Sequence, residues 1–198
     1  MTNDLITFLE NARINNLAQS ISTKEYVDFM RTGISNENAN LIMYLFEKFN
    51  GFTTSPASCK YHGAFIGGLF VHSMGVYEAA LKMASAHNVP WVDPIACIFH
   101  DVCKVGAYEI DEYKSTPEKT AFKYANNLGL PHGSESVRRL LKAGVQLSDA
   151  WEFAIAYHMG AFNANTEDTI NFGKMCEKYP QVLLLHNADM VASKIYEV

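Results

Sequence analysis

The sequence predicts an all-α fold, a single-domain helical bundle, and three observations support this prediction. Apolar residues recur at helical spacing along nearly the whole chain, and no alternating run is long enough to make a convincing strand. Capping residues and helix breakers divide the chain into roughly eight or nine helical segments. The chain has 198 residues, of which 48% are hydrophobic and 19% charged, a mixture typical of one globular domain.

The expected helix starts are marked by side chains that accept hydrogen bonds from the first free backbone N–H groups. Ser22 with Glu25 three residues later has the pattern of a capping box, and Ser35 precedes a long apolar-periodic stretch. The dipeptides Asp93-Pro94 and Thr116-Pro117 each place a cap before a proline suited to the first helical turn. The remaining expected N-caps are Ser134, Ser148 and Thr166.

The expected breaks between helices fall at glycines, asparagines and prolines, near Asn50-Gly51, 88–90, 129–133, Gly160 and Pro180. No repeat, low-complexity tract or linker separates these segments. Residues 1–198 are therefore expected to form one domain, in which residues 1–55 are a candidate N-terminal helical cap and residues 56–198 are the core that carries the candidate site.

Composition excludes several classes of function. The net charge of −5 argues against strong binding of duplex DNA but permits a small phosphorylated substrate. The chain has no run of about 18 apolar residues that could cross a membrane, and its first residues lack a secretory signal. The cysteines form no CxxC pair, so reduced thiols and a cytoplasmic location are expected; they are Cys59, Cys97, Cys103 and Cys176.

Six imidazole and carboxylate side chains stand in order along the chain as candidate metal ligands: His72, His100, Asp101, His132, His158 and Asp189. Asp189 shares an apolar helical stripe with Val182 and Leu185, where a carboxylate is unfavourable unless it is paired, hydrogen-bonded or bound to a metal. His72 also lies on an apolar face, after Gly67-Gly68, which would permit close approach of the backbone.

The other candidates lie at expected helix ends. His100 and Asp101 end the apolar run PIACIFHD, so this helix end is expected to open into an internal cleft. His158 lies on a stripe that Gly160 ends, and His132 lies in an expected loop before a helix. Each residue has a structural alternative: a satisfied core histidine, a histidine at a helix dipole, a solvated loop residue or a paired carboxylate. Jointly they favour a divalent metal site, and mixed ligation at two centres favours Mn or Fe, with Mg, Ni and Zn as further candidates.

These residues resemble the pattern of the HD-domain superfamily of metal-dependent phosphohydrolases over about residues 60–196. The stretch YHGAFIGGLFVHS resembles the HHxxxGGLLxHT signature of branches that include a bacterial exoribonuclease and certain conjugative relaxase domains. Tyr61 replaces the first His of that signature, and His62 matches the second. HDVCK resembles the HDxxK of two-metal branches such as cyclic-dinucleotide phosphodiesterases, although the GYP motif of cyclic-di-GMP enzymes is absent.

The resemblance implies a fold, a ligand set and an activity. One metal would be held by His72, His100, Asp101 and Asp189, and Asp101 would bridge to a second metal completed by His132 and His158. Lys104, and with it His62, would contact the substrate phosphate. A metal-activated water would hydrolyse a phosphoester of a nucleotide or short oligonucleotide, with Asp101 and Lys104 as the residues central to catalysis.

Two other functions stay open at this point: a di-iron oxygenase on the same scaffold, and a non-catalytic binding module with a structural metal. His186, one turn before Asp189, either orients that carboxylate or is an ordinary helix-surface histidine, and the second reading is favoured. The helix after His132 carries a small basic face, expected to be ordinary solvated surface, of Arg138, Arg139 and Lys142. The aromatic residues near the motifs either stack on a base or pack in the core; they are Tyr61, Phe65, Tyr108 and Phe162.

Overall fold

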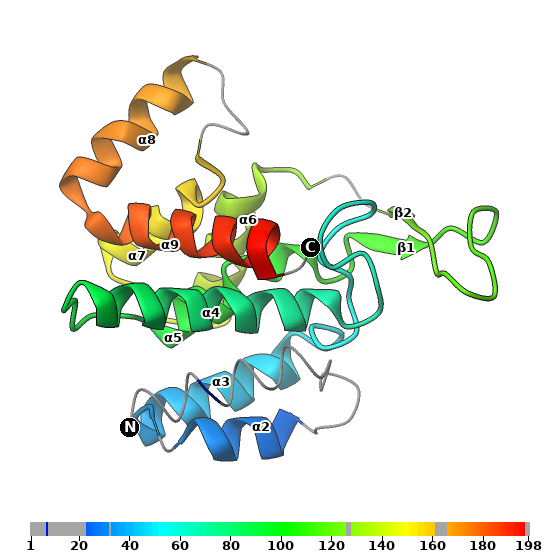
Figure 1. The fold of residues 1–198 in the computed structure, drawn as a ribbon, viewed down its shortest axis with the longest axis horizontal. Coiled ribbons are helices and arrows are strands. Elements are labelled where there is room, and N and C mark those ends of the chain that lie inside the picture. The colour runs from blue at the N-terminus through cyan, green and yellow to red at the C-terminus, as the bar shows by residue number, and fades with distance from the viewer. Residues whose placement is uncertain (1–6, 8–22, 32, 126–127, 161–165, 197–198) are drawn as a thin grey trace.

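The computed structural model describes residues 7, 23–31, 33–125, 128–160 and 166–196 of the chain. Within these residues the structure is mostly helical, with eight α-helices, two short non-α helical turns and one two-stranded sheet (Figure 1). The expectation of an all-α fold is therefore right in outline. No helix in the described ranges combines the length and the apolar character that a membrane crossing requires.

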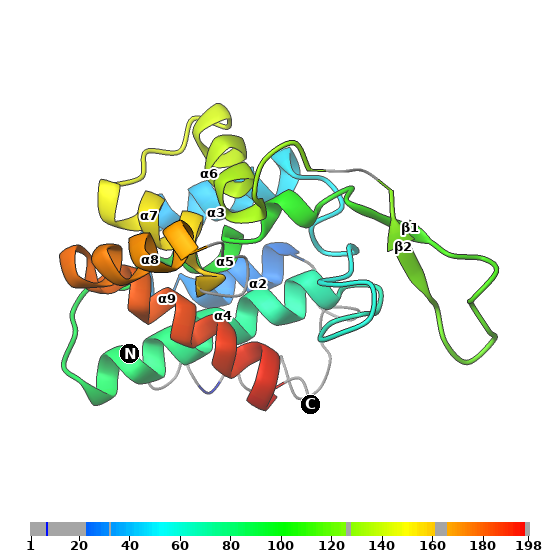
Figure 2. The same cartoon turned by 90° about the horizontal axis from the view of Figure 1, so that it is seen from above.

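Two long helices lie side by side through the middle of the molecule (Figures 1 and 2). They are α4 (Gly68–Ala86) and α9 (Pro180–Val191), and they pack directly on each other. Helix α7 (Asp149–Tyr157) packs on the other side of α9, and α6 (His132–Lys142) packs on α7. This succession of helices brings the starts of α4 and α6 and the end of α7 toward one region.

The short helix α5 (Pro94–Phe99) lies in the interior, with all six of its residues buried. It packs against α4, α7 and α3 (Asn36–Lys48), and α3 forms a helical pair with α2 (Thr23–Met30). A short apolar helix without a polar face must be enclosed on all sides, which explains its central place. Helix α8 (Thr166–Lys178) packs on α9 at the periphery (Figure 1).

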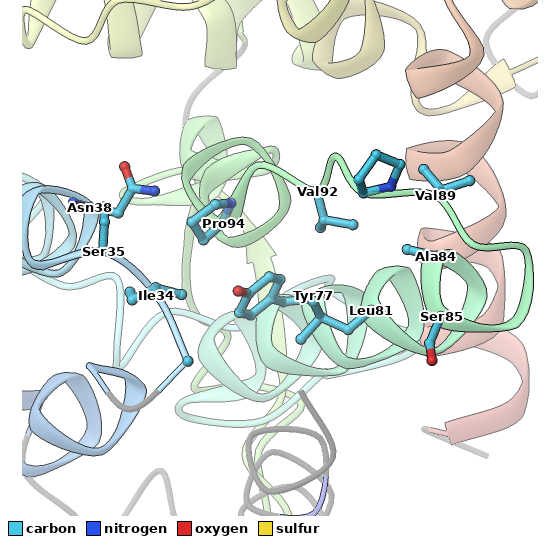
Figure 3. A pocket seen from close by; sticks show the side chains of 12 residues that line it. Ile34, Ser35, Asn38, Tyr77, Leu81, Ala84, Ser85, Val89, Val92 and Pro94 are labelled. Atoms are coloured by element: carbon cyan, nitrogen blue, oxygen red, sulfur yellow. Dashed lines mark hydrogen bonds between the residues drawn. The ribbon is translucent and has the colours of Figure 1, made fainter. Parts of the chain in front are cut away.

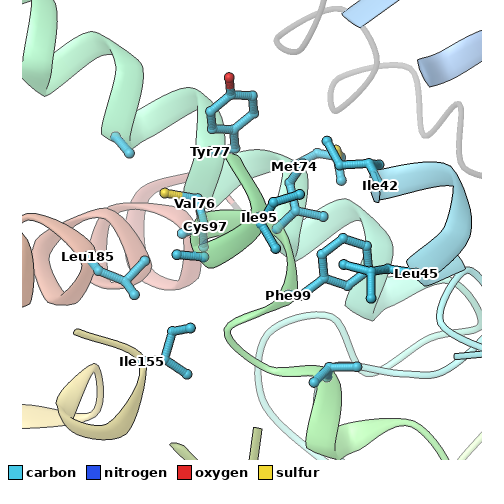
Figure 4. Packing of buried hydrophobic residues seen from close by; sticks show 14 of the residues in the cluster. Ile42, Leu45, Met74, Val76, Tyr77, Ile95, Cys97, Phe99, Ile155 and Leu185 are labelled. Carbon is cyan, nitrogen blue, oxygen red and sulfur yellow. The ribbon is translucent and has the colours of Figure 1, made fainter. Parts of the chain in front are cut away.

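One continuous hydrophobic core joins these helices. Phe99 of α5 packs among Leu45 of α3 and Met74 of α4, and Ile155 of α7 and Leu185 of α9 belong to the same cluster (Figure 4). Each such fully buried side chain contributes about 1.5–3 kcal/mol of hydrophobic stabilisation. The ends of α5 and α7, which carry site residues, are therefore anchored in the best-packed part of the molecule.

Several expected helix starts are confirmed. The Ser35 hydroxyl accepts from the backbone N–H of Asn38 at 3.1 Å, and the Asp93 carboxylate accepts from those of Ile95 and Ala96 at 2.8 and 3.1 Å. Ser148 occupies the N-cap position of α7, although its side chain makes no capping bond. Ser22 and the side chains of Glu25 and Thr166 lie outside the described residues.

The predicted helix start at Ser134 is wrong. Helix α6 begins at His132, directly after Pro131, and Ser134 already lies within its first turn. His132 is accordingly the first residue of a helix and not part of a loop.

The predicted helix after Thr116-Pro117 is also wrong. The segment forms an antiparallel hairpin in which β1 (Tyr108–Ile110) pairs with β2 (Phe122–Tyr124), and the hairpin projects from the helical body (Figures 1 and 2). Thr116 and Lys119 close a tight turn near its end, with the Thr116 N–H donating to the Lys119 carbonyl at 2.9 Å. A proline suits the second position of a β-turn as well as it suits the first turn of a helix, so its neighbours decide.

A cavity of about 410 Å³ lies between the start of α3, the C-terminal half of α4 and the segment before α5 (Figure 3). Tyr77 points into it from α4, between Ile34 and Leu81. None of the candidate metal ligands lines this cavity.

Candidate metal centre

The ends of four helices bring five of the candidate ligands together. His72 lies in the second turn of α4, His100 caps the end of α5 with Asp101 directly after it, His132 begins α6, and His158 caps the end of α7. All are buried except His132, whose side chain is 18% exposed. The end of PIACIFHD therefore lies in the interior, while its opening into a cleft stays a prediction.

The five side chains form two groups that share one carboxylate. His72, His100 and Asp101 form one group, and Asp101, His132 and His158 form the other; within each group one ligand atom per residue lies within 4.8 Å of the others. Such groups can hold a metal ion. The part of the chain described by the structure contains no other set of this kind.

The two oxygens of Asp101 face different pairs of histidines. Its Oδ2 lies 3.7 Å from His72 Nε2 and 3.4 Å from His100 Nε2. Its Oδ1 lies 3.5 Å from His132 Nε2 and 3.4 Å from His158 Nε2. A carboxylate placed in this way can contribute one oxygen to each of two cations.

Asp189 lies next to this arrangement but outside both groups. Its Oδ1 is 3.1 Å from His72 Nε2, and its side chain is largely buried on the apolar stripe predicted for α9. Its contact with His72 explains how a carboxylate is tolerated there. A direct bond from Asp189 to a metal stays a prediction.

Backbone carbonyls fix the orientation of two of the imidazole rings. His100 Nδ1 lies 2.9 Å from the Cys97 carbonyl oxygen, and His158 Nδ1 lies 2.7 Å from that of Ile155. Since a carbonyl oxygen only accepts, each Nδ1 carries the proton and donates. In the neutral ring Nε2 then presents its lone pair to the centre, the tautomer that a metal-binding histidine requires.

The polar atoms of the centre fit a cation. His100 Nε2 and Asp101 Oδ1 are fully buried and make no hydrogen bond in the structure, whereas buried polar atoms normally have a partner. His132 Nε2 and His158 Nε2 approach to 3.0 Å, so a proton or a cation is needed between their lone pairs. The donor set of imidazole nitrogens and a carboxylate suits a divalent transition metal.

The protonation states of His100, His132 and Asp101 suit metal binding, whereas burial acts to lower the pKa of His158 but Asp101 outweighs it and raises that pKa. Burial lowers the pKa of His100 and lowers that of His132 to about 3, so both rings are neutral near pH 7. Burial acts to raise the pKa of Asp101, but Lys104 and His100 outweigh it and hold that pKa well below its usual range. An ionised carboxylate beside neutral imidazoles is the form in which these groups bind metals.

Lys104 is directly bound to the shared carboxylate. Its Nζ lies 2.6 Å from Asp101 Oδ2, and its side chain is only 11% exposed. The short 3₁₀ turn Val102–Lys104, which directly follows Asp101, produces this contact. Lys104 is therefore not a solvated surface lysine, while its contact with a substrate stays a prediction.

Helix α6 holds the segment that follows Asp101. The Ser136 hydroxyl accepts from the Cys103 N–H at 3.2 Å, and the Arg139 guanidinium donates to the carbonyls of Val102 and Val105 at 3.3 and 3.0 Å. Glu135 in turn binds Arg139 at 3.0 Å. The interpretation of Arg139 as ordinary solvated surface is thus wrong. Helical spacing predicted that Arg139 lies on the polar face of its helix, but it did not predict the hydrogen bonds to these backbone carbonyls.

Two glycines permit the close helix contacts at the centre. A Cβ on Gly68 would lie 2.0 Å from the Gly63 carbonyl oxygen, which confirms the close approach expected before His72. A Cβ on Gly133 would lie 2.4 Å from the Ile155 carbonyl oxygen. The contact of Gly133 with Ile155 brings His132 beside His158. In the sequence this contact was indicated only by the glycine that directly follows His132.

His186 acts on a different neighbour from the one expected. Its Nδ1 donates to the backbone carbonyl of His158 at 2.7 Å, and its ring packs edge-on against Phe172 at 5.0 Å. Gly160 leaves room for this ring, since a Cβ there would lie 2.7 Å from His186 Cε1. His186 therefore ties α9 to the end of α7, and the favoured interpretation of an ordinary surface histidine is wrong.

A cavity of about 390 Å³ opens beside the centre. His62 lies in its wall, with its ring centroid 4.8 Å from that of His72. The described residues that line the cavity are Tyr61, His62, His158, Met159, Asp189, Met190, Ser193 and Lys194. Of the other aromatic candidates, Tyr108 pairs with Tyr124 on the hairpin at 5.1 Å, and Phe162 lies outside the described residues.

The fold and the centre together define a mostly helical protein with a buried histidine and aspartate cluster that can hold a metal ion. No protein-family model, curated protein or solved structure matches the chain. The likeness to the HD-domain superfamily therefore rests on the motif residues and on the compatible geometry of their cluster.

Proposed function

We propose that this chain is a metal-dependent phosphohydrolase that hydrolyses a phosphoester of a nucleotide or short oligonucleotide. The observation that carries the proposal is the position of Asp101, whose two oxygens face separate histidine pairs inside a buried cluster. A carboxylate shared between two cations is typical of sites that activate water for attack on phosphorus. The HD-type order of the same residues along the chain supports the proposal.

His72, His100, Asp101 and Asp189 would hold one ion, and Asp101, His132 and His158 would hold the other. Bound there, divalent ions would lower the pKa of a water ligand toward neutrality and offset charge on the phosphate oxygens. The protein supplies a dry, fixed surrounding, because the imidazoles are buried and two of them are held by backbone carbonyls. In hydrolysis a water oxygen bonds to phosphorus, the bond to the leaving oxygen breaks, and the leaving oxygen takes up a proton.

Lys104 supplies a positive side chain at the centre in this scheme. In the structure its ammonium group neutralises Asp101 Oδ2 at 2.6 Å. Once that oxygen serves a metal, the ammonium group would be released toward a phosphate oxygen within reach of its flexible side chain. A compact positive charge there would favour the transition state, in which negative charge shifts between the phosphate oxygens.

The test compares two variants by metal content and by turnover. Asp101→Ala should lose bound metal and all activity on a panel of nucleotides and cyclic nucleotides with added Mn²⁺. Lys104→Ala should keep its metal and lose turnover by about 10²-fold or more, the size of effect seen when one electrostatic contact is removed. Metal is measured by elemental analysis of the purified protein, and turnover by phosphate or nucleoside release.

The proposal is contradicted if Asp101→Ala keeps full phosphoesterase activity. Oxygen consumption with iron bound and without phosphate release would instead indicate an oxygenase. Bound metal without turnover on the whole panel would indicate a binding module.

A further inference from the structure

The cavity beside the centre has two chemically different parts. Its inner wall contains His158 and Asp189, which belong to or touch the His/Asp cluster. The rest of its lining is mainly apolar, with Met159 just after α7, Met190 of α9 and the ring of Tyr61, and it also includes Ser193 and Lys194. A phosphate attracted to the centre would therefore leave the rest of its molecule against an apolar surface.

The size and the lining of this apolar part suit one aromatic ring system. At about 390 Å³ the cavity lies near the lower end of the range of roughly 300–1,000 Å³ that is usual for small-molecule sites. Thioether side chains adapt to aromatic faces and make favourable contacts with them. Tyr61 is 78% exposed, so its ring is free to stack on a ligand at the mouth.

We infer that this cavity binds the nucleobase of the substrate, with Tyr61, Met159 and Met190 as its specificity-determining side chains. The inference rests on the proposed function for the position of the phosphate, and it adds that sugar phosphates without a base are poor substrates. An unsubstituted sugar would leave the methionines and the Tyr61 ring without a partner and would bring hydroxyl groups against them unpaired.

Kinetics with paired substrates test the inference on the whole protein. Adenosine 5′-monophosphate should be hydrolysed with a kcat/KM at least tenfold above that of ribose 5-phosphate. Tyr61→Ala should raise KM for the nucleotide about tenfold, as loss of one stacking contact predicts, with kcat unchanged. The loss for ribose 5-phosphate in the same variant should be smaller than the loss for the nucleotide, and Tyr61→Phe, which keeps the ring, should retain the nucleotide KM. Tyr113→Ala, which removes a ring that is 98% exposed on the hairpin, is the matched control and should change nothing.

A binding measurement separates this inference from the proposed function. Saturation-transfer NMR with the four common nucleosides, in the presence of a chelator, requires neither metal nor chemistry. Binding of at least one nucleoside to wild type and its loss in Tyr61→Ala supports the cavity assignment even if no phosphoester is hydrolysed. Absence of nucleoside binding, or equal kcat/KM for the nucleotide and the sugar phosphate, overturns it.

Discussion

At the scale of single residues, the centre depends on contacts that leave no room for an added atom. Gly133 is the clearest case, because its missing side chain lets the start of α6 touch the carbonyl of Ile155. That same carbonyl accepts the hydrogen bond from His158 Nδ1. One glycine thus sets both the distance from His132 to His158 and the orientation of the second ring.

Gly133→Ala should weaken metal binding and destabilise the protein by about 1–3 kcal/mol, the usual cost of overpacking a tight interior contact. The change forces α6 away from α7, which separates the two imidazoles. The measurements are the midpoint of urea unfolding and metal affinity by calorimetry.

The matched control is Gly173→Ala, also a glycine in a helix, where an added Cβ meets nothing within 4 Å. That substitution should stabilise the protein by up to about 1 kcal/mol through helix propensity alone. Equal effects of the two substitutions would show that the Gly133 contact is unimportant.

Glu135 gives a prediction for pH dependence. Hydrogen bonds from Arg138 lower the pKa of Glu135, and burial opposes this effect. Arg139 lowers the pKa further, so that it falls from 4.5 to about 2. Because the folded pKa lies below the unfolded value, the stabilisation is fully present above about pH 4.5 and is lost as the pH falls through about 2. Glu135→Gln should therefore be less stable than wild type by about 1–2 kcal/mol at pH 7.

The difference between wild type and Glu135→Gln should shrink below pH 4 and vanish near pH 2, as measured by urea unfolding across that range. Glu109→Gln serves as the control, since the exposed pair of Glu109 and Lys123 contributes less than about 1 kcal/mol at any pH. A constant difference for Glu135→Gln at every pH would disprove this assignment.

At the scale of elements, α6 acts as a support for the segment after Asp101. Arg138 and Arg139 both bind Glu135, but only Arg139 also reaches the carbonyls of Val102 and Val105. The two neighbouring arginines therefore form a natural pair of test and control.

Arg139→Ala should destabilise the protein by about 1–3 kcal/mol, because Glu135 loses one of its partners, the Val105 carbonyl loses the arginine donor and the Val102 carbonyl keeps only the Val105 N–H. Amide hydrogen exchange should accelerate in residues 101–106. Arg138→Ala should have a smaller effect on stability and should leave exchange in that segment unchanged. If both variants accelerate exchange equally, the support comes from Glu135 and not from Arg139.

The elements also show what a sequence can predict and where it fails. The cap at Asp93 was predictable because the carboxylate, the proline after it and the apolar run lie within a few residues of one another. The hairpin at Thr116 was not, since Pro117 fits both a helix start and a turn, and pairing of Ile110 with Phe122 is a contact between distant residues. The order of His72, Asp101 and Asp189 was readable from the sequence, but the way His132 and His158 meet depends on packing of α6 on α7.

At the scale of the whole molecule, the centre lies where α4, α5, α6 and α7 meet, and its residues extend from the same core that joins these helices. Since the unfolded chain cannot hold five distant side chains together, a metal that binds them should stabilise the entire fold. A ligand whose free concentration is a hundred times its Kd adds about 2.7 kcal/mol to the free energy of unfolding.

Added Mn²⁺ or Fe²⁺ should therefore raise Tm in a concentration-dependent way, and a chelator should reverse the rise. In Asp101→Ala the metal should have no effect on Tm. An equal rise in both proteins would locate the binding elsewhere.

The shared carboxylate also decides which substitutions would change the number of ions that the proposed centre holds. Replacing His132 or His158 removes a ligand from one group only, and the Asp101 oxygen that faces His72 and His100 stays in place. Replacing Asp101 by a non-acidic residue removes the carboxylate from both groups at once. If the proposed centre holds two ions, substitution of an imidazole could leave a one-ion centre, whereas substitution of Asp101 could not. Among related chains that have diverged from this one, we expect Asp101 to be retained more often than His132 and His158.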